Sequence, residues 1–307
     1  MKKISLKILS YFSLLLAFVI FVLLFLTFFL VNSSNFSSLI YSIILVVASV
    51  VITLLVIIFL IVLDPTMQQL ISALRPIFRF ESLSHPLLLK MAYNAPGTFH
   101  HAINVSILAQ KAAKSIGADA LLVRVAAYYH DLGKIEHPIK FIENQAGTEI
   151  PRSEDAKSIR TNAQIIINHV KSGVVLAQKN KLPIEVIDLI KQHHGTTRVL
   201  YFYEKAKERG LKIKQTDFRY DGPAPESREA AILMLADSVE AATRSIPNLT
   251  AETIETITSN TIADRLAEQQ FDAVKFEDGD LDKIKLSLNE TLRAIYHQRI
   301  IFQNEEN

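Results

Sequence analysis

The chain of 307 residues contains no cysteine. This absence excludes disulfide bonds, thiolate catalysis, iron–sulfur clusters and zinc sites built on sulfur ligands. Any metal that the protein binds must therefore be held by nitrogen and oxygen atoms of His, Asp or Glu side chains.

Charge is missing from a long stretch near the N-terminus, because residues 8–63 include no Asp, Glu, Lys or Arg. Segments 8–31 and 38–63 are each long enough to cross a bilayer as a helix, and a short polar link, NSSNFS, separates them. We predict a transmembrane hairpin over residues 1–63. A cleaved signal peptide would have a shorter apolar region, and a hairpin buried in a soluble core would have an amphipathic face.

Basic residues flank the outer ends of this hairpin and are absent from its link. They are Lys2, Lys3 and Lys7 before the first span, and Arg75, Arg79 and Lys90 after the second. The positive-inside bias places both ends in the cytoplasm. We therefore expect a multi-pass protein of a bacterial inner membrane, with lipid as one partner.

The composition becomes that of a soluble domain after Asp64. Residues 64–90 are expected to form a juxtamembrane linker, and residues 91–307 fit one domain. Residues 64–307 carry 30 basic and 31 acidic side chains, since three of the 33 basic residues precede them, so no DNA or RNA polymer is an expected partner. Apolar residues recur three and four apart in segments 98–116, 119–131, 158–179, 184–194, 226–245, 251–270 and 279–301. This pattern predicts an all-α domain.

Metal-competent side chains interrupt the apolar faces of these predicted helices. They are His101, His130, Asp131, His169, His193, His194 and Asp237. A single inward histidine is usually a core imidazole bonded to a carbonyl group, but a buried ionised aspartate must be paired or bound to metal. Shared metal ligation explains the whole set.

The size of this set indicates two metal ions. Seven nitrogen and oxygen ligands exceed what one tetrahedral site takes, whereas a carboxylate can bridge two ions roughly 3.5–4 Å apart. Asp131, next to His130 at a predicted helix end, is the expected bridge. Ligation without sulfur favours manganese or iron over zinc, cobalt or nickel, and hydrolysis of a phosphoester is the reaction that suits such a pair.

The order H…HD…H…HH…D resembles that of HD-domain metal-dependent phosphohydrolases. Several strings look more specifically like the membrane-anchored cyclic di-AMP phosphodiesterases of the PgpH type: APGTFHH (95–101), AAYYHDLGK (126–134), HHGTT (193–197), YFYEKAKE (201–208) and EAAILMLADSVEAATRS (229–245). The resemblance covers nearly all of residues 85–300 and implies an all-helical domain. It also implies hydrolysis of cyclic di-AMP to linear pApA by a hydroxide held between two divalent ions.

The resemblance further implies a role for each residue of the motifs. One ion would be held by His101, His130, Asp131 and Asp237, and the other by Asp131, His169, His193 and His194. Asp131 and Lys134 would be catalytic, with Lys134 neutralising phosphate charge unless it is only a surface lysine that ends a helix. Thr196, Thr197, Tyr201 and Tyr203 would contact substrate, although the two tyrosines are equally consistent with packing.

Four other histidines are not expected to be ligands: His85, His100, His137 and His297. Two features differ from the family pattern, namely the short membrane part and the stretch GTEIPRSEDAKS (147–158).

Rival interpretations are an HD enzyme for another nucleotide and a catalytically silent nucleotide sensor. HDLGKIEHP fits the HDxGKxxxP pattern of cyclic di-GMP enzymes, but the chain contains no GYP triplet, and guanosine-tetraphosphate hydrolases need acids where Leu-Gly-Lys stands. A second copy of the chain, forming a homodimer, is a further candidate partner.

Overall fold

A computed structural model describes residues 76–145, 155–244, 246 and 249–304, together with residues 18, 22, 25, 40, 47, 50 and 51. The chain divides into two compact units, Met1–Phe78 and Arg79–Asn307. Apart from isolated positions, the expected spans 8–31 and 38–63 lie outside the described residues. Among the helices that are described, none combines the length and apolar character that a bilayer crossing requires.

The second unit is built from helices. They are α4 (Pro86–Asn94), α5 (Pro96–Ser115), α6 (Ala120–Tyr129), α7 (Ala156–Lys179), α8 (Ile184–Gln192), α9 (Leu200–Glu208), α10 (Arg228–Arg244), α11 (Ala251–Ala267) and α12 (Asp280–Asn304). Short 3₁₀ helices are η1 (Pro76–Phe80), η2 (Leu132–Glu136), η3 (Pro138–Lys140), η4 (Ile142–Asn144) and η5 (Gln215–Phe218). Within these ranges strand-type pairing is limited to one isolated bridge between Arg198 and Arg219, so the all-α prediction is confirmed for the domain.

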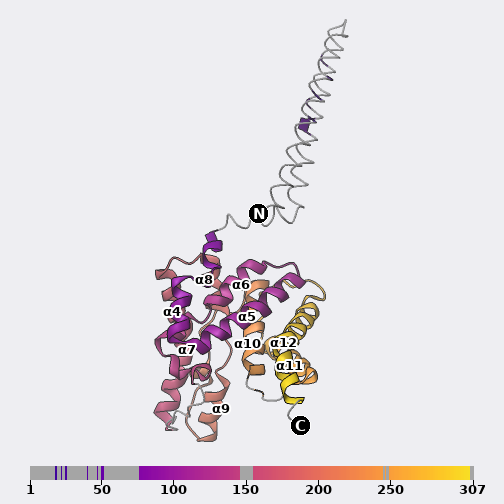
Figure 1. Ribbon diagram of the computed structural model, residues 1–307. Coiled ribbons are helices and arrows are strands. Elements are labelled where there is room, and N and C mark those ends of the chain that lie inside the picture. The colour runs from indigo at the N-terminus through magenta and orange to yellow at the C-terminus, as the bar shows by residue number, and fades with distance from the viewer. Residues whose placement is uncertain are drawn as a thin grey trace. The chain divides into compact units, whose positions relative to one another are not determined.

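Helix α5 lies at the centre of the unit and packs against α4, α6, α10 and α12. Figure 1 shows α11 and α12 on one side of α5 and α10, and α7 with α9 on the other. The α5 core face is made of small and branched residues such as Ala102, Val105, Leu108 and Ala109, all fully or nearly fully buried. Small side chains let neighbouring helices approach closely, which brings polar residues of several helices into one interior space.

Side chains cap the starts of the site-bearing helices. Asp119 accepts a hydrogen bond from the Leu122 amide (3.0 Å) at α6, and Asp155 accepts one from the Ser158 amide (2.8 Å) at α7. Pro96 occupies the first position of α5, where its missing N–H costs no helical hydrogen bond. These caps define where the helices begin, and so they help to determine which side of each helix a given residue faces.

Two helices were not among the predicted segments. α4 falls within residues 64–90 and the start of the expected domain, yet Leu87, Leu88 and Met91 are buried against the core. The compact unit that contains α4 begins at Arg79. α9 buries only Phe202 and Ala206, so its apolar face is too narrow to give a clear helical pattern in the sequence.

Candidate metal centre

The seven predicted ligand residues converge in the interior of the helical unit. His101 projects from α5, His130 and Asp131 follow the end of α6, His169 lies on α7, His193 and His194 follow the end of α8, and Asp237 lies on α10. All are buried except His194, whose side chain is 21% exposed. Segments more than a hundred residues apart thus contribute to one site.

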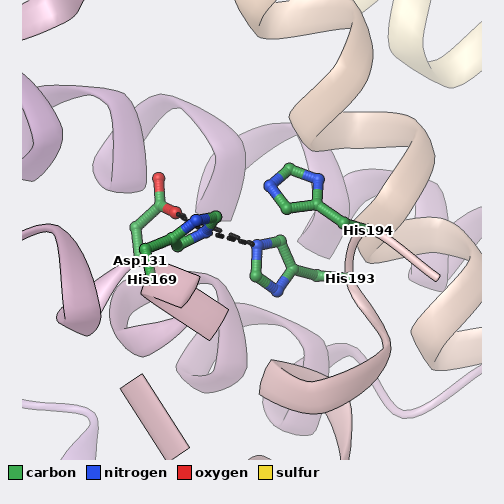
Figure 2. A group of neighbouring side chains, drawn as sticks. All are labelled: Asp131, His169, His193 and His194. Atoms are coloured by element: carbon green, nitrogen blue, oxygen red, sulfur yellow. Dashed lines mark hydrogen bonds and ion pairs between the residues drawn. The ribbon is translucent and has the colours of Figure 1, made fainter. Parts of the chain in front are cut away.

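The seven side chains form two groups that are each compact enough to hold a cation. Asp131, His169, His193 and His194 make one group, and His101, His130 and Asp237 make the other, with the candidate ligand atoms of each group within 4.8 Å of one another. Figure 2 shows the first group, with the Asp131 carboxylate beside the His169 ring and the rings of His193 and His194 next to it. The fourth predicted ligand of the second group, Asp131, joins it through its other oxygen.

Asp131 lies between the two groups with one carboxylate oxygen toward each. Oδ1 is 3.2 Å from His169 Nε2 and 3.9 Å from His193 Nε2. Oδ2 is 3.1 Å from His130 Nε2 and 3.5 Å from His101 Nε2. A carboxylate placed in this way can bridge two cations, one on each side.

Three of the histidines are oriented by contact of Nδ1 with the backbone carbonyl oxygen three residues earlier. The Nδ1 atoms of His130 and His193 lie 2.7 Å from the carbonyl oxygens of Ala127 and Ile190. His169 Nδ1 contacts the carbonyl oxygen of Ile166 in the same way. A ring that donates from Nδ1 carries no proton on Nε2 when it is neutral, so Nε2 is free to bind a metal.

Buried polar atoms without a regular hydrogen bond lie between the groups. His130 Nε2 and both oxygens of Asp131 are buried and make no hydrogen bond of regular geometry within the described chain, although ion-pair contacts reach them. Buried polar atoms normally have partners. Divalent cations bound by nitrogen and oxygen ligands would satisfy these atoms, so the residues fit the metals that the sequence predicts.

The charges of the buried carboxylates shift the pKa values of the neighbouring histidines. Burial alone would lower the pKa of His130, but Asp131 and Asp237 outweigh it and raise this pKa to about 10. Burial and the neighbouring rings of His130 and His169 lower the pKa of His193 to about 3. The carboxylates thus favour positive charge at the centre, which bound cations would also supply.

Lys134 is part of the centre and not a surface residue that ends a helix. Its ammonium nitrogen lies 2.7 Å from Asp131 Oδ2 and 2.9 Å from Glu143 Oε1, and its side chain is 12% exposed. Burial would lower the pKa of Lys134, but Asp131 and Glu143 raise it above its ordinary value. Lys134 therefore presents a fixed positive charge at the edge of the ligand cluster.

A close approach of two glycines places the HD pair beside α7. A Cβ atom added to Gly133 would lie 1.9 Å from the His169 carbonyl oxygen and 2.7 Å from the Gly173 amide nitrogen. No side chain of any kind fits there. This contact between η2 and α7 brings Asp131 within reach of His169.

The four residues expected to contact substrate have different surroundings. The Thr197 hydroxyl donates to the His194 carbonyl oxygen (2.8 Å), and the Thr196 hydroxyl accepts from Gln270 (2.9 Å). Tyr203 packs edge-on against Phe218, while Tyr201 is 53% exposed on α9. The structure brings the threonines next to His194, and Tyr203 belongs to a cluster of packed side chains.

Three residues of the site were missed in the sequence. Glu143 holds Lys134, Glu240 contacts Nδ1 of His101, and Tyr220 stacks on His194 with ring centroids 4.2 Å apart. Glu143 lies on a 3₁₀ turn and Tyr220 in an irregular segment, so no periodicity indicated that they face inward. Glu240 stands one turn after Asp237, which is the one signal that could have identified it.

The side chains of three of the four histidines not expected to be ligands are described, and none of the three belongs to either group. His100 and His137 are exposed, and His85 begins α4, where Nδ1 accepts a hydrogen bond from the Leu87 amide (3.4 Å). The side chain of His297 lies outside the described residues, as does most of the 147–158 stretch.

Known proteins share this architecture and sequence. The family model for the HD domain matches residues 98–242. The cyclic-di-AMP phosphodiesterase PgpH of Bacillus subtilis (strain 168) is 43% identical over 231 residues, which are 75% of this chain and 32% of that protein. The cyclic-di-AMP phosphodiesterase PgpH of Listeria monocytogenes serotype 1/2a (strain 10403S) is 42% identical over 223 residues, which are 73% of this chain and 31% of that protein.

A crystal structure of the L. monocytogenes PgpH HD domain aligns with a TM-score of 0.66 at 42% identity and covers 70% of this chain and 100% of that one. A crystal structure of the same domain in complex with cyclic-di-AMP gives the same TM-score and identity, with 99% of that chain covered. The chain spans about a third of the length of the curated relatives that it matches.

Proposed function

Since the chain belongs to the HD-domain family, we propose that it is a metal-dependent phosphodiesterase that hydrolyses cyclic di-AMP to the linear dinucleotide pApA. The observation that carries the proposal is Asp131, whose two oxygens face two separate groups of metal-competent side chains. The relatives named as cyclic-di-AMP phosphodiesterases, and the related domain solved with that nucleotide, support the choice of substrate.

The ligand groups suit two divalent cations. His101, His130, Asp131 and Asp237 would hold one ion, and Asp131, His169, His193 and His194 the other. Histidine and carboxylate ligands without sulfur favour Mn²⁺ or Fe²⁺. When bound, such a pair supplies Lewis-acid activation of water and neutralises charge on a phosphodiester.

The chain's own residues position and neutralise the phosphodiester. Lys134 stands 2.7 Å from Asp131, so a phosphate oxygen at the centre would lie within reach of its ammonium group. Glu143 keeps that group in place from the other side at 2.9 Å. A preorganised cation next to the developing charge lowers the barrier without any rearrangement during the reaction.

The proposed product, pApA, requires cleavage of the bond between phosphorus and the 3′ oxygen. Water adds to one phosphorus atom, the bond from that atom to the 3′ oxygen breaks, and the 3′ oxygen takes a proton. The ring therefore opens to a linear dinucleotide with a 5′ phosphate. We propose that Thr196 and Thr197, which follow His194 after Gly195, contact this substrate, and that Tyr201 offers an exposed ring for an adenine.

We further propose that residues 8–31 and 38–63 anchor the enzyme in the inner membrane, with the HD domain in the cytoplasm. The charge-free stretch and the lysines and arginines at its outer ends support this topology.

Turnover of a panel of cyclic dinucleotides by the purified full chain with Mn²⁺ tests the proposed function. Chromatography of the products should show pApA, and cyclic di-AMP should be cleaved at least about tenfold more efficiently than cyclic di-GMP, a difference of about 1.4 kcal/mol in transition-state stabilisation. Equal or reversed preference would contradict the substrate assignment. No turnover of any dinucleotide by metal-loaded protein would contradict the activity itself.

A further inference from the structure

His101 differs from the other buried ligand histidines in the group that its Nδ1 atom contacts. His130, His169 and His193 each lie against a neutral backbone carbonyl three residues earlier. His101 Nδ1 instead contacts Oε2 of Glu240, a carboxylate from another helix. One metal position therefore includes a histidine whose Nδ1 contacts a carboxylate, whereas His169 and His193 of the other position contact backbone carbonyls.

Glu240 is a buried carboxylate that is held in place from three directions. Its side chain is 1% exposed, and it lies on α10 one turn after Asp237. The Asn104 amide donates to Oε1 at 3.2 Å, and Arg244 NH1 lies 3.8 Å from Oε2. A buried carboxylate costs free energy unless it is paired, so its contacts fix both its charge and its position.

Charge contacts connect this carboxylate to the rest of the centre. Arg244 also lies 3.9 Å from Glu143, which pairs with Lys134. Alternating charges thus run along one edge of the site from Glu240 to Lys134. At Lys134 these charges reach Asp131, which both metal positions share, whereas the described contacts of Glu240 with histidine are to His101 alone.

A carboxylate that accepts the Nδ1 proton of an imidazole increases the negative charge on Nε2. It also fixes the ring so that Nε2 faces the metal. In this protein His101 Nε2 faces Asp237 Oδ1 at 3.0 Å and Asp131 Oδ2 at 3.5 Å. Glu240 is therefore placed to strengthen cation binding by the His101, His130 and Asp237 group alone.

We propose that Glu240 is a positioning residue that raises, through His101, the affinity of the His101, His130 and Asp237 position for its cation and has no direct contact with the histidines of the other position. The inference rests on the proposed function, because it assumes that both groups hold a cation. Glu240 is not itself a ligand, and its effect passes through His101.

Equilibrium dialysis of the full chain against increasing free Mn²⁺, with bound metal counted by elemental analysis, tests this proposal. His169→Ala removes a ligand of the position that also includes His193 and His194, so the ion that remains most tightly bound belongs to the His101, His130 and Asp237 position. Adding Glu240→Gln to that background should weaken this ion roughly 10- to 100-fold. Adding Glu240→Gln to His101→Ala, where the partner ring is absent, should change the affinity of the remaining ion less than about twofold.

Glu229→Gln is the matched control, because Glu229 lies on the same helix and accepts a hydrogen bond from the Asp119 amide away from the centre. Gln at position 240 is nearly isosteric and still accepts a hydrogen bond from His101, and circular dichroism verifies that each variant is folded. Should a background variant fail to fold, the two-step Mn²⁺ isotherm of Glu240→Gln alone replaces it, and one of the two steps should shift.

Equal weakening in both backgrounds, or no weakening with His169→Ala, would overturn the role of Glu240. A parent chain that binds fewer than two ions at saturation would instead overturn the two-metal proposal on which it rests. The two failures are therefore distinguishable in one set of titrations.

Discussion

Replacement of Asp131 by alanine is the most informative perturbation of the centre. Its Oδ1 lies 3.2 and 3.9 Å from the Nε2 atoms of His169 and His193, and its Oδ2 lies 3.1 and 3.5 Å from those of His130 and His101. Asp131→Ala removes a ligand from both proposed metal positions and also removes the negative charge between them. Each cation should therefore bind more weakly.

The size of the effect follows from the charges. Two unit charges 4 Å apart repel by about 4 kcal/mol at an effective dielectric constant of 20, and two doubly charged ions by about four times as much. Ligand charge must offset this repulsion, and the bridging carboxylate contributes to both sides. If Asp131 supplies even a quarter of the offset, about 4 kcal/mol, its loss lowers occupancy or rate about a thousandfold.

Elemental analysis after dialysis, paired with turnover of cyclic di-AMP, measures the effect. The Asp131→Ala protein should hold fewer than two ions per chain and lose activity, and Asp131→Asn should behave similarly because it keeps the shape but not the charge. Asp272→Ala, at an exposed position, is the control. Two tightly held ions and near-normal turnover in the Asp131→Ala protein would refute the bridging role.

Other perturbations separate the remaining parts of the account. Lys134→Ala leaves all seven proposed ligands in place, so the turnover rate should fall about 10²-fold while the metal content stays the same. Loss of metal would show instead that Lys134 organises the ligands. Gly133→Ala introduces a Cβ 1.9 Å from the His169 carbonyl oxygen and should lower the free energy of unfolding, measured by denaturant titration, by about 2 kcal/mol or more. The Cβ of Gly173→Ala meets its nearest atom at 3.3 Å, so this variant should lose less stability. Equal stability of the two variants would contradict the close-contact argument. A cysteine at Asn35, unique in a chain that has no other, should react with an impermeant thiol reagent in intact cells; labelling only after permeabilisation would contradict the proposed topology.

The ligand residues could be recognised from the sequence because each stands at a helical spacing from apolar neighbours. His101 shares the buried face of α5 with Val105 and Leu108, and Asp237 shares that of α10 with Leu233 and Met234. A polar residue inside a buried stripe is informative on its own, without knowledge of the tertiary structure. The apolar pattern therefore indicated which of these polar side chains face the interior.

The residues that support the ligands could not be recognised in the same way. Glu143 lies on the short helix η4, where its carboxylate meets Lys134 only because Gly97 lets α5 approach that turn: a Cβ on Gly97 would be 1.8 Å from the Glu143 carbonyl oxygen. Tyr220 reaches His194 from an irregular segment that has no periodic pattern. Such contacts depend on how distant segments pack, and the sequence carries no local signal for them.

Anomalous diffraction at the manganese edge, from crystals of the full chain or its HD domain grown with Mn²⁺, tests the central claim most directly. We expect one peak on each side of Asp131, one near His101, His130 and Asp237 and the other near His169, His193 and His194. A single peak, or two peaks that do not share Asp131 as a ligand, would contradict it.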